Sequence, residues 1–404
     1  MKHVAIIGAG ASGLVCAIIA ARKGHSVTLF EKNSKVGRKI LATGNGRCNI
    51  TNQSVSLSRY HGEAIHLLKD VFKRFDTTTC KTFFRSLGLE MREGEEGRLY
   101  PMSHQASSVV DLLVHEARSL NVVFHLDAEV QDITCNEGQF VLHVKEQTHF
   151  FDACVIATGS LAMPTLGSSG SGYVFAKKLG HAIIEPCASL VQLTSNEAHL
   201  KEVSGVKIDT NVTLFRNNQK VQSVLGDVLF TNYGLSGSAI LDVSRIVSKA
   251  SLNGDSIYVL LDLMPAFSQE ALQTLLQKRL SIASGKSLAL WLEGLIPKKL
   301  AHFIVLHTHL THLKTASDCS PKEIKKLVFA LKSLKVSIAG TKGFESAEVC
   351  AGGVDVREID AKTLMSHKIN NLYFCGEVLD VDGDCGGFNL HFAWASGYLV
   401  GHNL

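Results

Sequence analysis

Three glycines and one glutamate near the start of the chain have the spacing of a dinucleotide-binding site. Gly8, Gly10 and Gly13 follow a short apolar segment and open a helical one. The first glycine permits a tight turn, the second lets the backbone approach a pyrophosphate, and the third permits close packing of helix and strand. Glu31 follows Gly10 by 21 residues, where a carboxylate accepts hydrogen bonds from ribose hydroxyls. This set favours FAD or NAD over a 2′-phosphorylated nucleotide.

A second group of residues with chemical potential lies later in the chain. One apolar strand ends at Thr158-Gly159, and another ends at Gly376-Glu377, with Asp380 shortly after it. The string Gly386-Gly387-Phe388-Asn389 then opens the last helix. A carboxylate after such a strand suits a ribitol chain, and a helix N-terminus stabilises the negative charge of a reduced flavin. The second group therefore indicates a flavin beside the nucleotide of the first.

The elements that position these residues follow from the hydropathy pattern. The uncharged run Val4–Ala21 has nearly the length of a membrane span, but its three glycines fit a strand, a turn and a helix. We therefore expect no membrane segment. Residues 1–190 alternate strands and helices, as in a nucleotide-binding α/β domain. Further elements are expected as strands at Ser26–Phe30, Val122–Leu126 and within Ala128–Thr158, and as helices at Glu63–Phe75, Thr79–Leu87 and Ser107–Leu120.

The middle of the chain has a different pattern. We divide the 404 residues into a discontinuous FAD-binding domain (1–190 and 336–404), a β-rich insertion (191–262) and a basic helical insertion (263–335). Expected strands of the β-rich insertion are Val212–Phe215, Val221–Val224, Asp227–Phe230 and Ser256–Leu261. A strand at Asn371–Cys375 and a helix at Asn389–Val400 close the chain.

Charge and cysteine content restrict the class of protein. The net charge is +4, yet residues 264–340 alone hold eleven Lys or Arg against four Asp or Glu, a net charge of +7. Such asymmetry fits a partner with negative charge, and a solvated lysine-rich helical surface explains it equally well. The ten cysteines show no C-x-x-C pair, so neither a zinc ribbon nor an iron–sulfur cluster is indicated, and reduced thiols in a cytoplasmic protein are expected.

Other motifs are discounted as sites. The run Asp380-x-Asp382-x-Asp384 begins like a calcium loop, but Cys385 and His391 stand where the loop needs glycine and an acid. No carboxylate or cysteine completes a metal set with the histidines of the basic insertion, which are His302, His307, His309 and His312. We expect no metal. Gly167–Gly172 has the wrong spacing for a second dinucleotide turn, so NADH or NADPH would visit a flavin without a Rossmann domain of its own.

Taken together, these motifs make the chain resemble the BaiN/RdsA-like (YhiN-like, aminoacetone-oxidase-like) FAD-dependent oxidoreductases. The resemblance covers nearly the whole chain and is most specific at Gly37–Asn52 and Gly376–Asn389. Leu229–Gly237 and the pair Gly340–Phe344 and Ala351–Val354 are also similar to family patterns.

Two residues depart from the family pattern, since Asn232 stands where the family usually has histidine and Ser238 where it has proline. The implied α/β fold is a glutathione-reductase-like FAD-binding Rossmann domain with inserted β-barrel-like and helical domains. The residues that we expect to bind FAD are Gly8, Gly10, Ala11, Ser12, Gly13, Glu31, Lys32, Arg38, Lys39, Gly44, Val130, Thr158, Gly159, Gly376, Glu377, Asp380, Gly386, Gly387, Phe388 and Asn389.

The resemblance also implies a reaction. Family members include proposed enone reductases and a synthase of dihydrouridine in ribosomal RNA, and both reactions reduce a C=C bond conjugated to a carbonyl group. We therefore expect this reduction, with uridine of large-subunit rRNA as leading substrate and residues 264–340 as the RNA-binding segment. The alternatives are a flavin amine oxidase, a small-molecule enone reductase, and an RNA-binding protein with structural FAD.

The reduction also needs an acid that protonates the substrate. Cys48, beside Arg47, is our first candidate proton donor, and we expect its thiol to titrate near neutral pH. Packing alone, the role of most buried cysteines, is the more common explanation. His391 and Cys385 are the next candidates.

Overall fold

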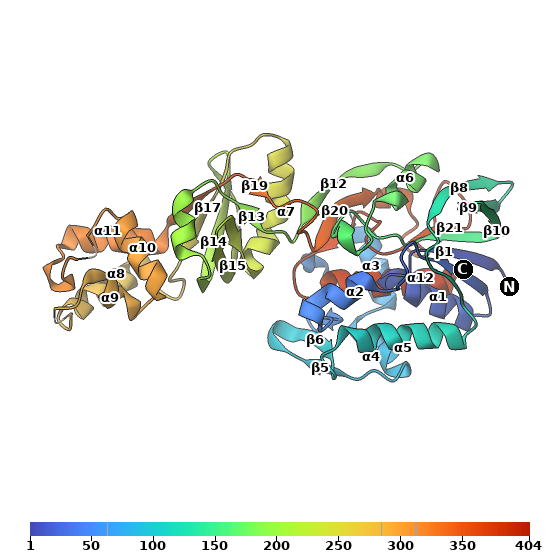
Figure 1. The fold of residues 1–404 in the computed structure, drawn as a ribbon, viewed down its shortest axis with the longest axis horizontal. Coiled ribbons are helices and arrows are strands. Elements are labelled where there is room, and N and C mark those ends of the chain that lie inside the picture. The colour runs from blue at the N-terminus through green and yellow to red at the C-terminus, as the bar shows by residue number, and fades with distance from the viewer. Residues whose placement is uncertain (63, 284, 312) are drawn as a thin grey trace. The chain divides into compact units, whose positions relative to one another are not determined.

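The computed structural model describes residues 1–62, 64–283, 285–311 and 313–404, which form two compact units (Figure 1). Unit 1 comprises Met1–Ala188 and Ala347–Leu404, and unit 2 comprises Ser189–Ser346. Glu63, the first residue of a predicted helix, and His312 lie outside the described residues. Among the residues described, no helix has the length and apolar character that crossing a membrane requires.

A five-stranded parallel sheet forms the centre of unit 1, with the strand order β21-β11-β1-β2-β7. Its strands β1 and β11 are buried along nearly their whole length, as the parallel arrangement requires. The strands are β1 (His3–Ile7), β2 (Ser26–Phe30), β7 (Val123–His125), β11 (Ala153–Ile156) and β21 (Leu372–Phe374).

Helices α1 (Ala11–Arg22) and α12 (Phe388–Asn403) pack against each other through glycines. A Cβ atom added to Gly397 would stand 2.2 Å from the carbonyl oxygen of Ser12, and one added to Gly401 would stand 2.7 Å from Cβ of Ile19. Neither approach is possible for a real side chain, so only glycine lets the helices come this close. Because each helix begins at one of the predicted binding motifs, this contact fixes the two motifs relative to each other.

The remaining elements of unit 1 surround this sheet. The predicted helices are present within one or two residues of their expected ends, and the segment after β7 forms the antiparallel sheet β10-β9-β8. The further helices are α2 (Arg38–Ala42), α3 (Ile65–Arg74), α4 (Thr77–Ser86), α5 (Ala106–Ser119) and α6 (Ser171–Lys178). The further strands are β3 (Thr51–Asn52), β4 (Tyr60–His61), β5 (Met91–Glu93), β6 (Arg98–Pro101), β8 (Val130–Asn136), β9 (Gln139–Val144), β10 (Gln147–Phe151), β12 (Ile183–Ser189), β20 (Val349–Val354) and β22 (Asp382–Gly383).

Unit 2 contains a seven-stranded antiparallel sheet, ordered β18-β17-β14-β15-β16-β13-β19. The sequence pattern predicts two strands at Val221–Val224 and Asp227–Phe230. The structure instead shows one continuous strand, β15, that passes through Gly226. The strands are β13 (Leu193–Thr194), β14 (Lys207–Arg216), β15 (Gln219–Thr231), β16 (Gly234–Ser236), β17 (Ile257–Asp262), β18 (Leu334–Ile338) and β19 (Gly340–Thr341).

Helix α7 (Ser238–Leu252) was not predicted within this β-rich segment. Gly226 makes room for its first turn, because a Cβ there would lie 2.8 Å from Oγ of Ser238. The Ser238 hydroxyl donates to Asp227 Oδ1 at 2.6 Å, an interaction that the family's proline lacks. Asn232, the other departure from the family pattern, is exposed between β15 and β16.

Where it is described, the predicted helical segment contains four α-helices that share a core with this sheet. They are α8 (Gln269–Leu280), α9 (Leu288–Glu293), α10 (Lys298–His307) and α11 (Pro321–Lys332). Both inserted segments thus belong to one compact unit. Strand β18 pairs with β17, so unit 2 continues to Ser346, beyond the boundary that we set at residue 336.

Candidate functional site

The turn between β1 and α1 has the backbone geometry that its glycines require. Gly8 has a φ angle of +107°, and a Cβ on it would stand 2.4 Å from the carbonyl oxygen of Ala157. A Cβ on Gly13 would stand 2.0 Å from the carbonyl oxygen of Gly8. Gly10, by contrast, caps α1 and has open space beside it. The turn is therefore closed on the protein side and open where a pyrophosphate would approach the helix.

Glu31 follows β2, and three hydrogen bonds fix its carboxylate. Oε2 accepts from the backbone N–H of Ala9 at 3.0 Å, and Oε1 accepts from both the backbone and the side-chain amide of Asn33. Arg38 in turn donates to Oδ1 of Asn33 at 2.8 Å. The sequence gives no sign of this role for Asn33, because the role depends on the turn that brings Asn33 back to Glu31. The Glu31 carboxylate is thereby held beside the glycine turn.

The other residues expected on the nucleotide side lie along the same edge of the sheet. Ala128 donates its N–H to the carbonyl of Glu31 at 2.9 Å, which places the segment leading to Val130 beside the end of β2. Lys32 is half-buried in this turn. Thr158 and Gly159 follow β11, the strand that neighbours β1. The structure thus brings these residues to the carboxyl ends of adjacent parallel strands.

Glu377 connects the second predicted group to the first. Its Oε2 forms an ion pair of 2.6 Å with Nζ of Lys39, and its Oε1 accepts from the backbone N–H of Cys350 at 3.0 Å. The preceding residue, Gly376, has a φ angle of +77°, and a Cβ there would stand 2.4 Å from Oγ of Ser12. The end of β21 therefore lies directly against the first turn of α1.

An unpaired polar atom of Asn49 lies beside the N-terminus of α12. Gly386 and Gly387 have φ angles of +130° and +100°, and Gly387 caps the helix. A Cβ on Gly387 would lie 2.9 Å from Oδ1 of Asn49. Asn49 is only 9 % exposed, and its Oδ1 has no hydrogen-bond partner within the described part of the chain. Buried polar atoms normally have partners, so this oxygen marks a place where a ligand would supply one.

Several residues expected to bind FAD have structural partners of their own. The buried carboxylate of Asp380 accepts from the N–H of Gly352 at 3.0 Å and so holds β20. The side chain of Asn389 exchanges hydrogen bonds with the backbone of Gly383. Phe388 is buried, and Gly44, with a φ angle of +57°, lies beside Asn49. The side chains of Asp380 and Asn389 thus have partners within the protein, and binding of FAD by these four residues stays a prediction.

The predicted titration of Cys48 is wrong. Its side chain is fully buried, and burial raises the pKa of the thiol to about 12. A thiol with this pKa stays protonated at neutral pH and does not cycle with a thiolate. Arg47, which we expected to stabilise the thiolate, is exposed and lies over the ring of Tyr100 at 5.1 Å. Cys48 thus packs in the core, the alternative that the sequence also allowed.

His391 is a poor proton donor for a related reason. It is fully buried in α12, where it donates from Nε2 to the carbonyl of Phe75 at 3.2 Å and accepts at Nδ1 from the hydroxyl of Thr51 at 2.8 Å. Burial lowers its pKa to about 4. A neutral imidazole with both nitrogens bonded inside the protein has no proton to give to a substrate. Its side chain therefore serves to hold α12 in place.

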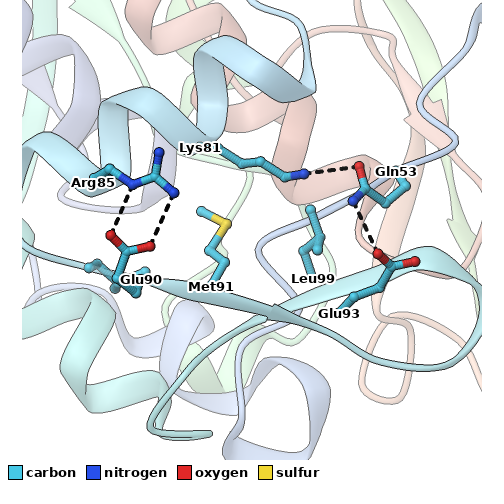
Figure 2. Close-up of a pocket in the computed structure, with 8 residues that line it drawn as sticks. Gln53, Lys81, Arg85, Glu90, Met91, Glu93 and Leu99 are labelled. Carbon is cyan, nitrogen blue, oxygen red and sulfur yellow. Dashed lines mark hydrogen bonds and ion pairs between the residues drawn. The ribbon is translucent and has the colours of Figure 1, made fainter.

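A separate pocket of about 230 Å³ lies between α4 and the strands β5 and β6 (Figure 2). Its polar side chains bind one another: Arg85 pairs with Glu90 at 2.9 Å, and Gln53 bridges Lys81 and Glu93. Its charges are therefore already satisfied. Over the described residues, we find no group of three or more side chains that could bind a metal.

The residues around the two helix N-termini fit FAD. The glycine turn at Gly8–Gly13 leaves room for a pyrophosphate, and the fixed carboxylate of Glu31 suits a ribose. The unpaired Asn49 oxygen beside Gly387 suits a polar ring edge. The N-termini of α1 and α12 both lie in unit 1, and the contact between the two helices fixes their relative position.

Comparison with known proteins gives matches over the whole chain. The HI0933-like protein Rossmann domain matches residues 2–403. A 3-dehydro-bile acid delta(4,6)-reductase of Clostridium scindens is 36 % identical over 99 % of this chain and 98 % of its own. A ribosomal RNA dihydrouridine synthase of Escherichia coli is 34 % identical over 99 % of this chain and 97 % of its own.

The structural comparison agrees at the level of the fold. A 3-ketosteroid delta1-dehydrogenase of Sterolibacterium denitrificans has a TM-score of 0.50 at 11 % identity and covers 99 % of this chain and 98 % of its own. The matches over the full length confirm the resemblance seen in the sequence. The chain therefore belongs to the HI0933-like Rossmann family and is an FAD-dependent oxidoreductase.

Proposed function

We propose that the protein reduces a C=C bond conjugated to a carbonyl group, with uridine of large-subunit rRNA as the leading substrate. The observation that carries the proposal is the pair of full-length relatives. One is named a bile acid delta(4,6)-reductase and the other a ribosomal RNA dihydrouridine synthase. Both names describe saturation of a C=C bond, and in uracil the C5=C6 bond is conjugated to the C4 carbonyl. One chemistry thus accounts for both relatives.

The residues of unit 1 have distinct roles in this proposal. The turn Gly8–Gly13 binds the pyrophosphate of FAD, Glu31 binds the adenosine ribose, and Glu377, oriented by Lys39, binds the ribitol chain. The N-terminus of α12 and Asn49 bind the polar edge of the ring system. When bound, the flavin supplies the hydride for the reduction. NADH or NADPH is the proposed source of its electrons.

Exposed residues of α11 support an RNA substrate. Lys322, Lys325 and Lys326 are all exposed, and Phe329 is 64 % exposed on the same helix. Lysines neutralise phosphates without reading sequence, and an exposed aromatic ring can stack on an unpaired base. Lys298 of α10 is also exposed, whereas Lys299 donates to the carbonyl of Ser204 at 2.8 Å.

The histidines of the basic segment contribute less to this proposal. His302 lies 3.5 Å from Glu293. His307 stacks on Phe303, and burial lowers its pKa. An imidazole with a lowered pKa carries less positive charge at neutral pH, so we assign RNA binding to the lysines.

The experiment that tests the proposal separates the two half-reactions. The purified protein is bleached anaerobically with NADH or NADPH and then mixed with one oxidant at a time: oxygen, an rRNA fragment, a 3-oxo-Δ4-steroid or an amine-derived imine. Rapid reoxidation by rRNA with formation of dihydrouridine supports the leading substrate. Reoxidation by the steroid but not by rRNA would assign a small-molecule reductase, which the bile acid reductase relative favours. Reoxidation by oxygen alone would contradict both.

A further inference from the structure

The proposed reduction requires a proton for the carbon next to the carbonyl group. Neither Cys48 nor His391 can supply it at neutral pH, because one is a buried thiol with a high pKa and the other a buried neutral imidazole. The donor should instead be an acid that solvent or substrate can reach and that stands beside the two flavin-side motifs.

Glu348 is a carboxyl group in such a position. It immediately precedes β20, and Cys350, two residues later, donates its backbone N–H to Glu377 at 3.0 Å. Glu377 is the carboxylate that pairs with Lys39 at 2.6 Å. Val349 and Cys350 are buried, whereas Glu348 is exposed to solvent. The chain therefore anchors the strand at Glu377 and leaves the Glu348 side chain reachable.

The charges of two cations, Lys39 and Arg98, act on Glu348, and both cations lie beside flavin-side motifs. Lys39 belongs to the ion pair with Glu377. Arg98 pairs with Glu96 at 2.7 Å, and its Nε would lie 3.8 Å from a Cβ on Gly386. The two charges that act on Glu348 thus stand one at the end of β21 and the other beside the glycines that open α12.

The surroundings of Glu348 favour its protonated form. Desolvation by the protein atoms around it raises its pKa above the ordinary value, and the charges of Lys39 and Arg98 oppose this rise. The residue as a whole is nevertheless exposed, so solvent reaches part of it. A carboxyl group that is both reachable and reluctant to ionise has the properties of a general acid.

We propose that Glu348 is the catalytic acid of the substrate half-reaction, an inference that rests on the proposed function. The hydride adds to the β carbon of the conjugated bond, and the electron pair of the C=C bond moves toward the carbonyl oxygen. The O–H bond of the Glu348 carboxyl then breaks, and a C–H bond forms at the α carbon, which is C5 in uracil. The resulting carboxylate takes a proton from water, so the reduction consumes one hydride and one proton in total.

The test compares three variants in separate half-reactions. Glu348→Gln removes the acid at nearly constant size, Glu348→Asp keeps an acid on a shorter side chain, and Glu146→Gln makes the same change at an exposed hairpin position. Reduction of the flavin by NADH or NADPH should be unchanged in all three. Reoxidation by the substrate that oxidises the wild type should fall by about 100-fold or more in Glu348→Gln, within the usual contribution of a general acid.

The rate of reoxidation should depend on pH in a direction that the role of Glu348 fixes. The acid must be protonated, so reoxidation of the wild type should slow as the pH rises through the Glu348 pKa. Glu348→Gln should lack this limb, and Glu348→Asp should keep it at a lower rate. A second readout needs no turnover, since a carboxyl group that ionises beside the flavin changes the absorption spectrum of the oxidised holoprotein with pH. This spectral change should be absent in Glu348→Gln and present in Glu146→Gln.

The outcomes distinguish this inference from the proposed function. If no conjugated C=C compound reoxidises the wild-type protein, the proposed function fails. If the wild type reacts and Glu348→Gln reacts at the same rate with the same pH profile, Glu348 is not the acid and the proposed function stands. Loss of flavin reduction in Glu348→Gln would also overturn the assignment, because it would place Glu348 in the other half-reaction.

Discussion

Lys39 and Glu377 are 338 residues apart in the sequence and form an ion pair of 2.6 Å. The pair joins the start of α2 to the loop after β21, so the two halves of the discontinuous unit 1 meet at this contact. Both side chains are partly shielded from solvent. The lysine holds the Glu377 carboxylate in one orientation, which is what a binding residue requires.

Breaking this pair should weaken FAD binding. Glu377→Gln removes the charged acceptor, and we expect about a tenfold increase in the Kd for FAD, since a hydrogen bond to a charged group contributes about 1.5 kcal/mol. The measurement is titration of apoprotein with FAD, followed by flavin fluorescence. Lys178→Gln is the matched control, because it breaks the exposed Lys178–Asp132 pair of similar length. Equal FAD affinity in both variants would show that Glu377 does not contact the cofactor.

The glycine contact between α1 and α12 should be sensitive to one methyl group. Gly397→Ala should destabilise unit 1 by about 1–3 kcal/mol, because the added Cβ has no room beside the Ser12 carbonyl. Thermal release of FAD, followed by fluorescence, reports this change. In Gly294→Ala the new Cβ would meet only the movable guanidinium group of Arg279, so this control should melt close to the wild type. A Gly397→Ala protein that releases FAD at the wild-type temperature would refute the tight contact.

His391 should make the stability of unit 1 depend on pH. The folded protein keeps this imidazole neutral with a pKa of about 4, whereas the unfolded chain binds a proton near pH 6.5. As the pH decreases, the unfolded state therefore binds a proton at His391 before the folded state does. The free energy of unfolding falls between about pH 6.5 and pH 4, by about 3 kcal/mol in total.

His391→Gln removes this titration. At pH 7 the variant should have a lower free energy of unfolding than the wild type, because it loses the buried hydrogen bonds of His391. This difference in free energy should become smaller toward pH 4. Other titrating groups cancel in the comparison. Thermal denaturation from pH 7 to pH 4.5 measures the two curves, and parallel curves would show that His391 does not titrate as its burial requires.

The lysines of α11 should determine binding to RNA. In the double variant Lys325→Glu with Lys326→Glu, affinity for a large-subunit rRNA fragment should fall, and the slope of log K against log salt should decrease by about 2. FAD content should not change. The control, Lys145→Glu, reverses a charge on an exposed turn of unit 1. No RNA binding by the wild type at moderate salt, or an unchanged slope, would contradict an RNA partner.

The motifs that sequence analysis located correctly depend on local backbone geometry. Gly8 and Gly13 each occupy a position where any Cβ would collide with the backbone, so residue type alone predicts the turn. Helix α7 was missed because it lies between strands and because the close approach of Gly226 to its first turn is not visible in the sequence. Its place becomes evident only after the strands pair.

The roles of single polar residues were harder to predict. Cys48 and His391 lie in motifs that favour chemistry, but both are fully buried, and His391 packs against Phe75, which is far away in the sequence. Asn33, Asn49 and Glu348 were overlooked because nothing in the sequence assigns a role to their side chains, although Asn49 lies in the family stretch Gly37–Asn52. Their importance comes from a hydrogen bond, an unpaired oxygen and a nearby pair of cations, all of which exist only in the folded chain.

The close contact of α1 and α12 makes unit 1 selective for the length of its ligand. The two helix N-termini are held at a fixed separation by backbone atoms, and no side-chain rotation can change it. An ADP moiety alone would satisfy the α1 end, and a flavin mononucleotide alone would satisfy the α12 end. Only a molecule that reaches both ends would use the whole site, so we expect Gly397 and Gly401, which set the helix contact, to favour a dinucleotide over its halves without touching it.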